Sequence, residues 1–141
     1  MNQSASRQFL FLLHCTLLTG VVGCGESSGP SGPGQLHITL ESSNTDDAAA
    51  VLELSGSGLG NVEVLGGEAF LQQEGNTTRV VIVLDDAGKI DFSIDVDDMS
   101  QRPTVRILQV ADGDNRLRGS VADYETAIQP LAALAESGRG Q

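Results

Sequence analysis

Two short groups of oxygen-bearing side chains are the best candidates for a metal site in this sequence. Their members are Asp95, Asp97 and Asp98 in the first group and Asp112, Asp114 and Asn115 in the second. Calcium takes about six to eight oxygen ligands, and loops rich in such side chains supply them. In the second group, however, Arg116 stands where a calcium-binding loop needs a third oxygen, and no glutamate follows at the closing position. We therefore expect solvated turns at both places, with a weak calcium site as the alternative and no other metal site.

Catalytic and cofactor-binding patterns occur in the sequence, but each lacks the structural context that it needs. Residues 25–29 match the G-x-S-x-G nucleophile pattern, yet a Pro- and Gly-rich stretch follows where that motif requires a helix. Residues 56–60 read G-x-G-x-G, and a strand pattern follows where a phosphate-binding loop requires a helix N-terminus. His37 is the only histidine after residue 24, and the sequence identifies no partner for it. We predict no catalytic residue and no bound cofactor.

The N-terminal segment has the pattern of a targeting sequence. Residues 1–7 carry one charged side chain, Arg7, and the mainly apolar stretch 9–22 follows. A helix of that length spans about 21 Å, whereas the hydrocarbon core of a bilayer is about 30 Å thick. The stretch is therefore too short for a good membrane span, and its order of positive, apolar and small residues is typical of a secretory signal.

The end of this segment resembles the lipobox of bacterial lipoproteins, in the four residues Val21-Val22-Gly23-Cys24. The resemblance implies that residues 1–23 are a lipoprotein signal peptide and that Cys24 carries a diacylglycerol and an acyl chain such as palmitate. Several acyl chains together anchor a protein stably, whereas one chain binds only marginally. The second cysteine of the sequence, Cys15, would leave with the signal peptide. We therefore expect a lipid anchor in the cell envelope, at the outer membrane, and no disulfide bond.

The remaining chain divides by composition into a tether, a domain and a tail. Residues 24–34 are rich in Gly, Ser and Pro, a composition that forms a flexible or semi-extended spacer. Residues 35–128 are long enough to bury a single core. Residues 129–141 contain helix formers but end in Gly, Arg, Gly and Gln, so we expect a frayed helix or disorder there.

Alternating apolar and polar residues predict that the domain is all β. Residues 90–96 alternate strictly, and this pattern places Ile90, Phe92, Ile94 and Val96 on one buried face. Turn residues such as Gly75 and Asn76 separate the strands. We predict an antiparallel β-sandwich of seven or eight short strands, similar to Ig-like or cohesin-like modules. The expected strands are 36–40, 48–54, 61–64, 68–73, 79–84, 90–96, 104–110 and 117–124, of which 79–84 should be a central strand covered on both sides or lying under a loop.

Charge restricts the partners of the domain. The formal net charge is −11, and residues 24–100 contain 14 acidic and two basic side chains. Repulsion would oppose binding to nucleic acid or to anionic headgroups through this surface. We therefore expect a non-catalytic interaction or structural module of the bacterial cell envelope, with a protein or glycan partner and no nucleic acid. The alternatives are a calcium-dependent adhesion or glycan-binding module and, less favoured, an envelope hydrolase.

We predict that Cys24→Ser abolishes lipid attachment and leaves an uncleaved precursor, because no other residue can carry the anchor. Incorporation of radiolabelled palmitate into the full chain measures this effect. Cys15→Ser is the matched control and should incorporate label as the wild type does. Labelling of the Cys24→Ser protein would show that the lipoprotein assignment is wrong.

Overall fold

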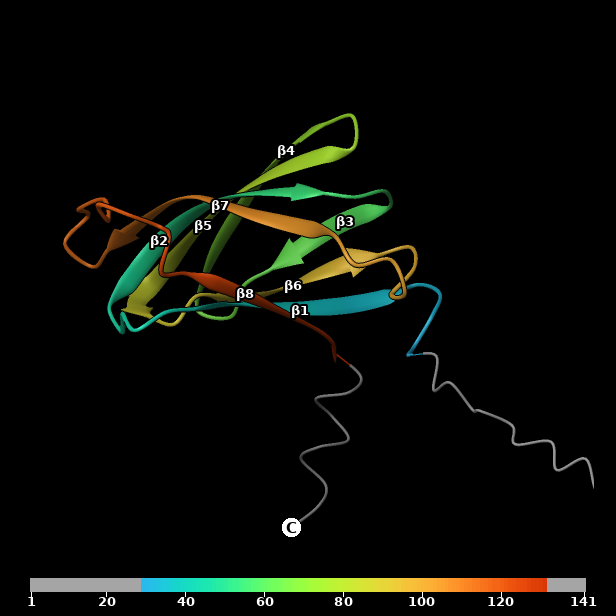
Figure 1. Cartoon of the computed structure of the whole chain (residues 1–141), viewed down its shortest axis with the longest axis horizontal. Helices are drawn as coiled ribbons and strands as arrows, with labels where there is room; N and C mark the ends of the chain where they lie inside the picture. Colours follow the sequence, from blue (N-terminus) through green and yellow to red (C-terminus); the bar gives the residue numbers. More distant parts are fainter. Residues whose placement is uncertain (1–28, 132–141) are drawn as a thin grey trace, which may run out of the picture.

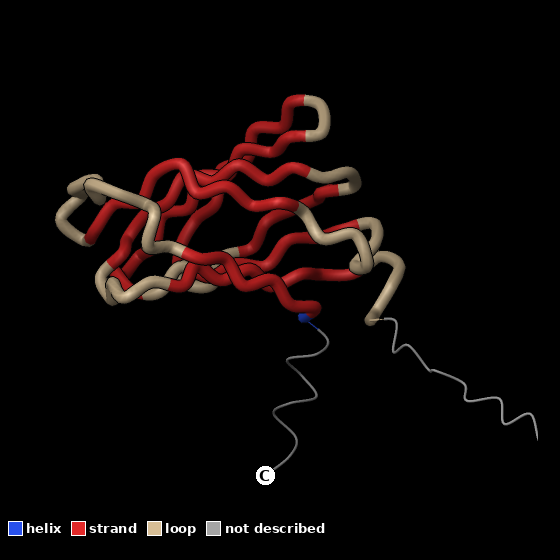
Figure 2. Tube along the Cα trace, in the orientation of Figure 1, coloured by secondary structure: helices blue, strands red, loops and turns tan. Residues whose placement is uncertain are grey.

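Residues 29–131 form two antiparallel β-sheets that pack face to face. The structure is a computed structural model, and it describes these residues. Sheet A has the strand order β3-β6-β1-β8, and sheet B has the order β4-β5-β2-β7 (Figures 1 and 2). The strands are β1 (Gly34–Glu41), β2 (Asp47–Ser55), β3 (Leu59–Glu63), β4 (Gly67–Glu74), β5 (Thr77–Gly88), β6 (Asp91–Val96), β7 (Thr104–Asp112) and β8 (Glu125–Pro130). The predicted all-β antiparallel sandwich is confirmed, and the closer likeness to Ig-like or cohesin-like modules stays a prediction.

The antiparallel strand pairs are nested around one central turn. β4 pairs with β5, β3 with β6, β2 with β7 and β1 with β8. The turn at the centre consists of Gly75 and Asn76, between the paired residues Glu74 and Thr77. Gly75 has a φ of 61°. A positive φ at the first central residue is the requirement of a type II′ hairpin turn, and glycine meets it without strain.

The core lies between the two sheets and consists of the inward residues of alternating strands. Every second residue of β1, β2 and β6 is buried, as the sequence pattern predicts. Phe92 is the largest fully buried side chain. The main contributors from the two sheets are Leu36, Ile38, Leu40, Ile90, Phe92, Ile94 and Val96 on one side and Ala50, Leu52, Leu54, Val80, Ile82 and Val110 on the other.

The prediction for strand 79–84 is wrong in one respect. Val80 and Ile82 are buried, but Val83 on the other face is 44% exposed. β5 is a central strand of sheet B, as expected, yet among residues 29–131 no second layer covers its outer face. The continuous apolar run therefore reflects one core face and one outer face that is partly open to solvent.

The last predicted strand is also misplaced. Residues 117–124 form a loop with one isolated bridge, between Leu117 and Ala111. The last strand is instead β8, which pairs with β1 and ends at Pro130. In the structure Arg118 and Tyr124 instead hold this segment as a loop against Asp47, in a polar network at the end of the sandwich that is described below.

Part of the predicted organisation lies outside the described residues. This part includes the signal peptide, Cys24 and most of the predicted tail. Among residues 29–131, no helix is long and apolar enough to cross a membrane.

We predict that Phe92→Ala lowers the free energy of unfolding by about 3 to 5 kcal/mol, because it leaves a cavity in the core. Phe70→Ala removes the same atoms from a side chain that is 56% exposed, and it should cost about 1 kcal/mol or less. Urea unfolding of dilute protein measures both values. Equal losses would show that the assignment of the two faces is wrong.

Candidate functional site

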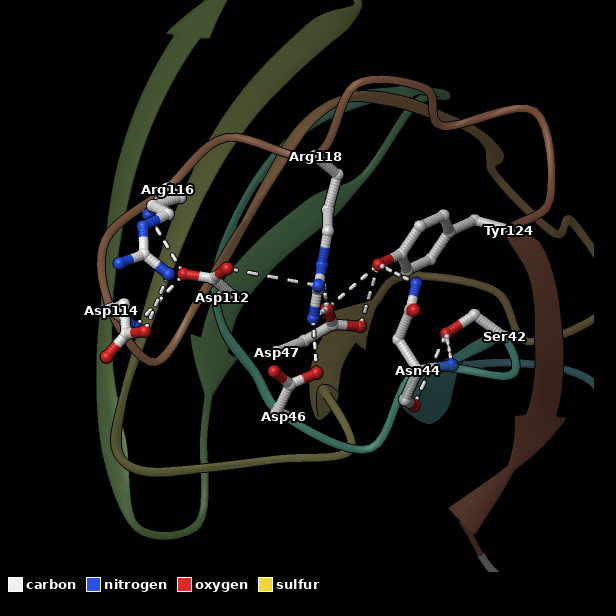
Figure 3. A network of polar contacts seen from close by, with 9 residues as sticks. All are labelled: Ser42, Asn44, Asp46, Asp47, Asp112, Asp114, Arg116, Arg118 and Tyr124. Carbon is white, nitrogen blue, oxygen red and sulfur yellow. Dashed lines mark hydrogen bonds and ion pairs between the residues drawn. The ribbon is translucent and has the colours of Figure 1, made fainter.

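A polar network lies at one end of the sandwich, where two loops meet (Figure 3). Loop 113–124 joins β7 to β8, and loop 42–46 joins β1 to β2. Between them, the side chain of Asp47 is only 5% exposed. Arg118 donates to Asp47 Oδ1 from Nε at 2.9 Å and from Nη2 at 2.8 Å, and the Tyr124 hydroxyl lies 2.8 Å from the same oxygen. We call Asp47, Arg118 and Tyr124 the clasp.

Arg118 holds two further carboxylates. Its Nη2 donates to Asp46 Oδ1, and its Nη1 lies 3.9 Å from Asp112 Oδ2. The hydrogen bonds to Asp46 and Asp47 raise the pKa of Arg118 further above its ordinary value. The guanidinium thus remains charged, and it reduces the repulsion among the three neighbouring carboxylates at the end of the sandwich.

Tyr124 connects the clasp to the loop before β2. Its hydroxyl donates to the Asp47 carboxylate and accepts a hydrogen bond from Asn44 Nδ2 at 2.8 Å. Burial and the bond to Asp47 raise the pKa of Tyr124. The Ser42 Oγ accepts a hydrogen bond from the Asn44 amide at 3.1 Å and fixes the loop that carries Asn44. The phenol therefore stays neutral and serves as a hydrogen-bond bridge between two loops.

The polar groups of the clasp hydrogen-bond to one another. An open depression of about 420 Å³ lies beside Asp47 and also contacts Lys89. Within residues 29–131, however, no buried side-chain nitrogen or oxygen lacks a hydrogen-bond partner. Arg118 holds Asp47 Oδ1, and the single proton of the Tyr124 hydroxyl is shared between the two carboxylate oxygens. The arrangement is suited to holding the two loops together.

The second group of calcium candidates forms a turn beside the clasp. Asp112 Oδ1 accepts hydrogen bonds from the backbone amides of Asp114 at 3.0 Å and Arg116 at 2.9 Å. The Arg116 amide is the main reason that the pKa of Asp112 is lowered. Asp114 pairs with the Arg116 guanidinium at 2.8 Å, and Asn115 has a φ of 61°. The structure therefore brings Asp112, Asp114 and Asn115 together in one turn. The two carboxylates there bond to backbone amides and to the Arg116 guanidinium.

The first group separates into two unrelated roles. Asp98 Oδ1 accepts from the Ser100 hydroxyl at 2.8 Å, the Ser100 amide at 3.0 Å and the Gly32 amide at 3.1 Å. These bonds, led by those from Ser100, lower the pKa of Asp98 to about 2. Asp95 instead accepts from Gln35 Nε2 at 2.9 Å. Asp98 thereby fixes the backbone at Gly32, a residue that the sequence analysis assigned to the tether.

The glycine-rich segment 56–60 lies against the remaining acid of this group. A side chain at Gly58 would approach Asp97 to 2.6 Å, and one at Gly60 would approach Asp95 to 3.0 Å. These glycines therefore let β3 approach β6 closely, and no helix follows them. An open depression of about 420 Å³ remains there. In the part of the chain that the structure describes, no group of three or more His, Cys, Asp or Glu residues could hold a metal ion.

The sheet register brings a serine and a histidine together on the outer face of sheet A. Ser93 lies opposite His37 in β1 and opposite Glu63 in β3, and His37 lies opposite Gln129 in β8. A catalytic triad requires the carboxylate on the far side of the histidine, where it orients the imidazole. Here the carboxylate is beside the serine, and an amide stands on the histidine side. These four residues across sheet A therefore stand in the wrong order for a catalytic triad.

The β4 edge of sheet B and the turn before it carry three of the five large apolar side chains that are exposed among the described residues. Phe70 and Leu71 are 56% and 43% exposed, and Leu65 in the preceding turn is 94% exposed. Phe70 lies opposite Val81, which in turn lies opposite Val51, so an apolar row crosses the outer face of sheet B. Sequence reasoning missed this edge, although two consecutive apolar residues in a short strand were a usable sign of it.

Comparison with known proteins gives no relative. No family model matches the chain, and no curated protein or solved structure matches it. The site must therefore be interpreted from its own geometry.

We predict that Asp47→Ala lowers the free energy of unfolding by about 1.5 to 3 kcal/mol, the range for losing hydrogen bonds to a charged group. Asp46→Ala is the matched control, because the neighbouring Asp46 side chain is 64% exposed and contacts the same arginine. It should cost less than about 1 kcal/mol. Thermal and urea unfolding measure both variants. An equal loss in the two would show that burial of Asp47 does not determine its contribution.

Proposed function

We propose that the protein is a lipid-anchored, non-catalytic interaction module of the bacterial cell envelope, and that it binds another protein through β4. The observation that carries the proposal is the open β4 edge, where Phe70 on the outer face and Leu71 on the inner face are both exposed. An extended segment added to such an edge gains backbone hydrogen bonds and side-chain contacts at once. The lipid anchor at Cys24 is the part of the proposal that rests on the lipobox.

The polar groups of the described residues support a binding role over catalysis. The polar groups of the clasp bond to one another, and the Ser93–His37 pair lacks a carboxylate on the histidine side. Two depressions of about 420 Å³ each border a carboxylate that a neighbouring side chain already holds, Asp95 by Gln35 in one and Asp47 by Arg118 in the other. These features give a hydrolase no activated nucleophile.

The aromatic residues favour a protein partner over a glycan. Within residues 29–131 the aromatic side chains are Phe70, Phe92 and Tyr124, and the last two are buried. A glycan would therefore find a single exposed ring, at Phe70, for stacking. An apolar ring on a strand edge is instead typical of protein contacts, where aromatic residues supply a large rigid contact area.

The position of the chain entry is compatible with an anchored module. Residues 29–33 lie beyond sheet A, whereas the β4–β5 hairpin extends from the opposite side of the molecule (Figures 1 and 2). A membrane attachment that precedes residue 29 would therefore enter the domain on the side away from β4. The edge would remain accessible to a partner.

Site-specific photocrosslinking in bacterial cells that express the full chain tests the proposal. A photoreactive phenylalanine analogue is placed at Phe70 or, as a control, at Gln109, which is exposed on the outer face at the opposite edge of sheet B. We expect a discrete protein adduct in the membrane fraction from position 70 and none from position 109. Absence of an adduct at position 70, equal labelling at the two positions, or recovery outside the membrane fraction would contradict the proposal.

A further inference from the structure

Four strands form the edges of the two sheets, and three of them carry features that limit further pairing. β3 is short and interrupted by a register shift, and β8 ends in Pro130, which has no N–H to donate. At the C-terminal end of β7, loop 113–124 folds back, and the Arg118 amide donates to the Val110 carbonyl at 2.8 Å. β4 has eight residues, no proline, lysine or register shift, and charged side chains only at Glu68 and Glu74. It is the edge left open for pairing.

The hairpin turn determines which backbone groups of β4 face outward. A two-residue turn closes on a hydrogen-bonded pair, here Glu74 and Thr77. Bonds that continue this alternation run from the Asp85 amide to the Gly66 carbonyl at 2.9 Å and from the Gly56 amide to the Asn76 carbonyl at 3.0 Å. Even-numbered residues of β4 therefore bond to β5. The outward groups belong to Gly67, Ala69, Leu71 and Gln73.

We propose that β4 pairs with β4 of a second copy of this chain, antiparallel, with Phe70 opposite Phe70. The inference rests on the proposed function and names its partner. In this register Ala69 faces Leu71 and Gly67 faces Gln73, so every outward group meets an outward group. The two Phe70 rings form a non-hydrogen-bonded pair, whose Cα atoms are about 4.5 Å apart and whose side chains are closest.

Two neighbouring registers also match outward groups with outward groups. One, with Ala69 opposite Ala69, leaves Gln73 without a partner in β4, and charge disfavours the other. With Phe70 opposite Phe70, each Glu68 faces the neutral Gln72 of the second copy. With Leu71 opposite Leu71, each Glu68 would face Glu74, and like charges directly opposite one another destabilise a sheet. The second register would also leave Gly67 unpaired. The acids at the two ends of β4 thus oppose the shifted register.

The proposed symmetry also suits two copies on one membrane. A two-fold axis perpendicular to sheet B keeps the same face of both copies on the same side. Residues 29–33 lie on the side of sheet A in each copy (Figure 1). Both chains would therefore enter from the same side of the dimer, and the apolar rows at Phe70, Val81 and Val51 would join across the interface.

Disulfide trapping tests the pairing and its register. Single substitutions Phe70→Cys, Leu71→Cys and Gln72→Cys are made in the full chain, which is purified in mild detergent so that the test does not depend on lipid at Cys24. Opposed cysteines at position 70 fall within the range of about 4.4 to 6.8 Å that a disulfide spans. Cysteines at position 72 would be four residues out of register, about 13 Å apart. Wild-type chain shows any bridge formed by its own cysteines.

We expect mild oxidation to trap a dimer with Phe70→Cys and little or none with the other two variants. In the Phe70→Cys chain, adding Gln72→Glu should lower the trapped fraction several-fold, because it places a carboxylate opposite Glu68. Adding Gln73→Glu changes the net charge equally but faces Gly67, and it should have little effect. Circular dichroism confirms that each variant is folded.

A trapped fraction that is equal at the three positions, largest at position 71 or 72, or no greater than wild type would overturn the pairing. An equal effect of the two glutamates would overturn the register. Failure here is distinguishable from failure of the proposed function, because a photoadduct at position 70 with a different protein would leave the binding role intact.

Discussion

The edges of two open β-sheets are the constraint on which this structure depends. A sandwich buries the inner faces of its sheets, but the backbone groups of each outermost strand remain available to any other strand. In this molecule the chain covers the C-terminal end of β7 with its own loop 113–124. That loop stays in place because Arg118 and Tyr124 bind the buried carboxylate of Asp47, so the clasp couples one edge of sheet B to the end of the core.

The clasp also determines how the molecule manages its negative charge. A buried carboxylate is costly unless charged and neutral donors surround it, and Asp47 has both kinds. Arg118 in addition neutralises Asp46 and lies near Asp112, which places one cation among three acids. Asp98 plays a similar organising role at the start of β1, with backbone and hydroxyl donors in place of a cation. Several acids that looked like calcium ligands thus bind the protein itself.

Local pattern predicted the core strands but not the contacts between distant segments. The alternation in β1, β2 and β6 was sufficient because each strand has one buried face. The clasp could not be predicted, since Arg118 and Tyr124 lie 71 and 77 residues from Asp47 in sequence. β8 was missed because it is short and contains Pro130. The open outer face of β5 was missed because an apolar run does not say whether a second layer covers it.

Amide hydrogen exchange along β4 tests the central claim, that this edge is open and made for pairing, most directly. In dilute protein the amides of Phe70 and Gln72 should exchange slowly, because they bond to β5, while those of Ala69, Leu71 and Gln73 should exchange quickly. At high protein concentration the second set should become protected and the first should change little. Slow exchange of all five amides in dilute protein, or fast exchange of Ala69 and Leu71 at every concentration, would contradict the account.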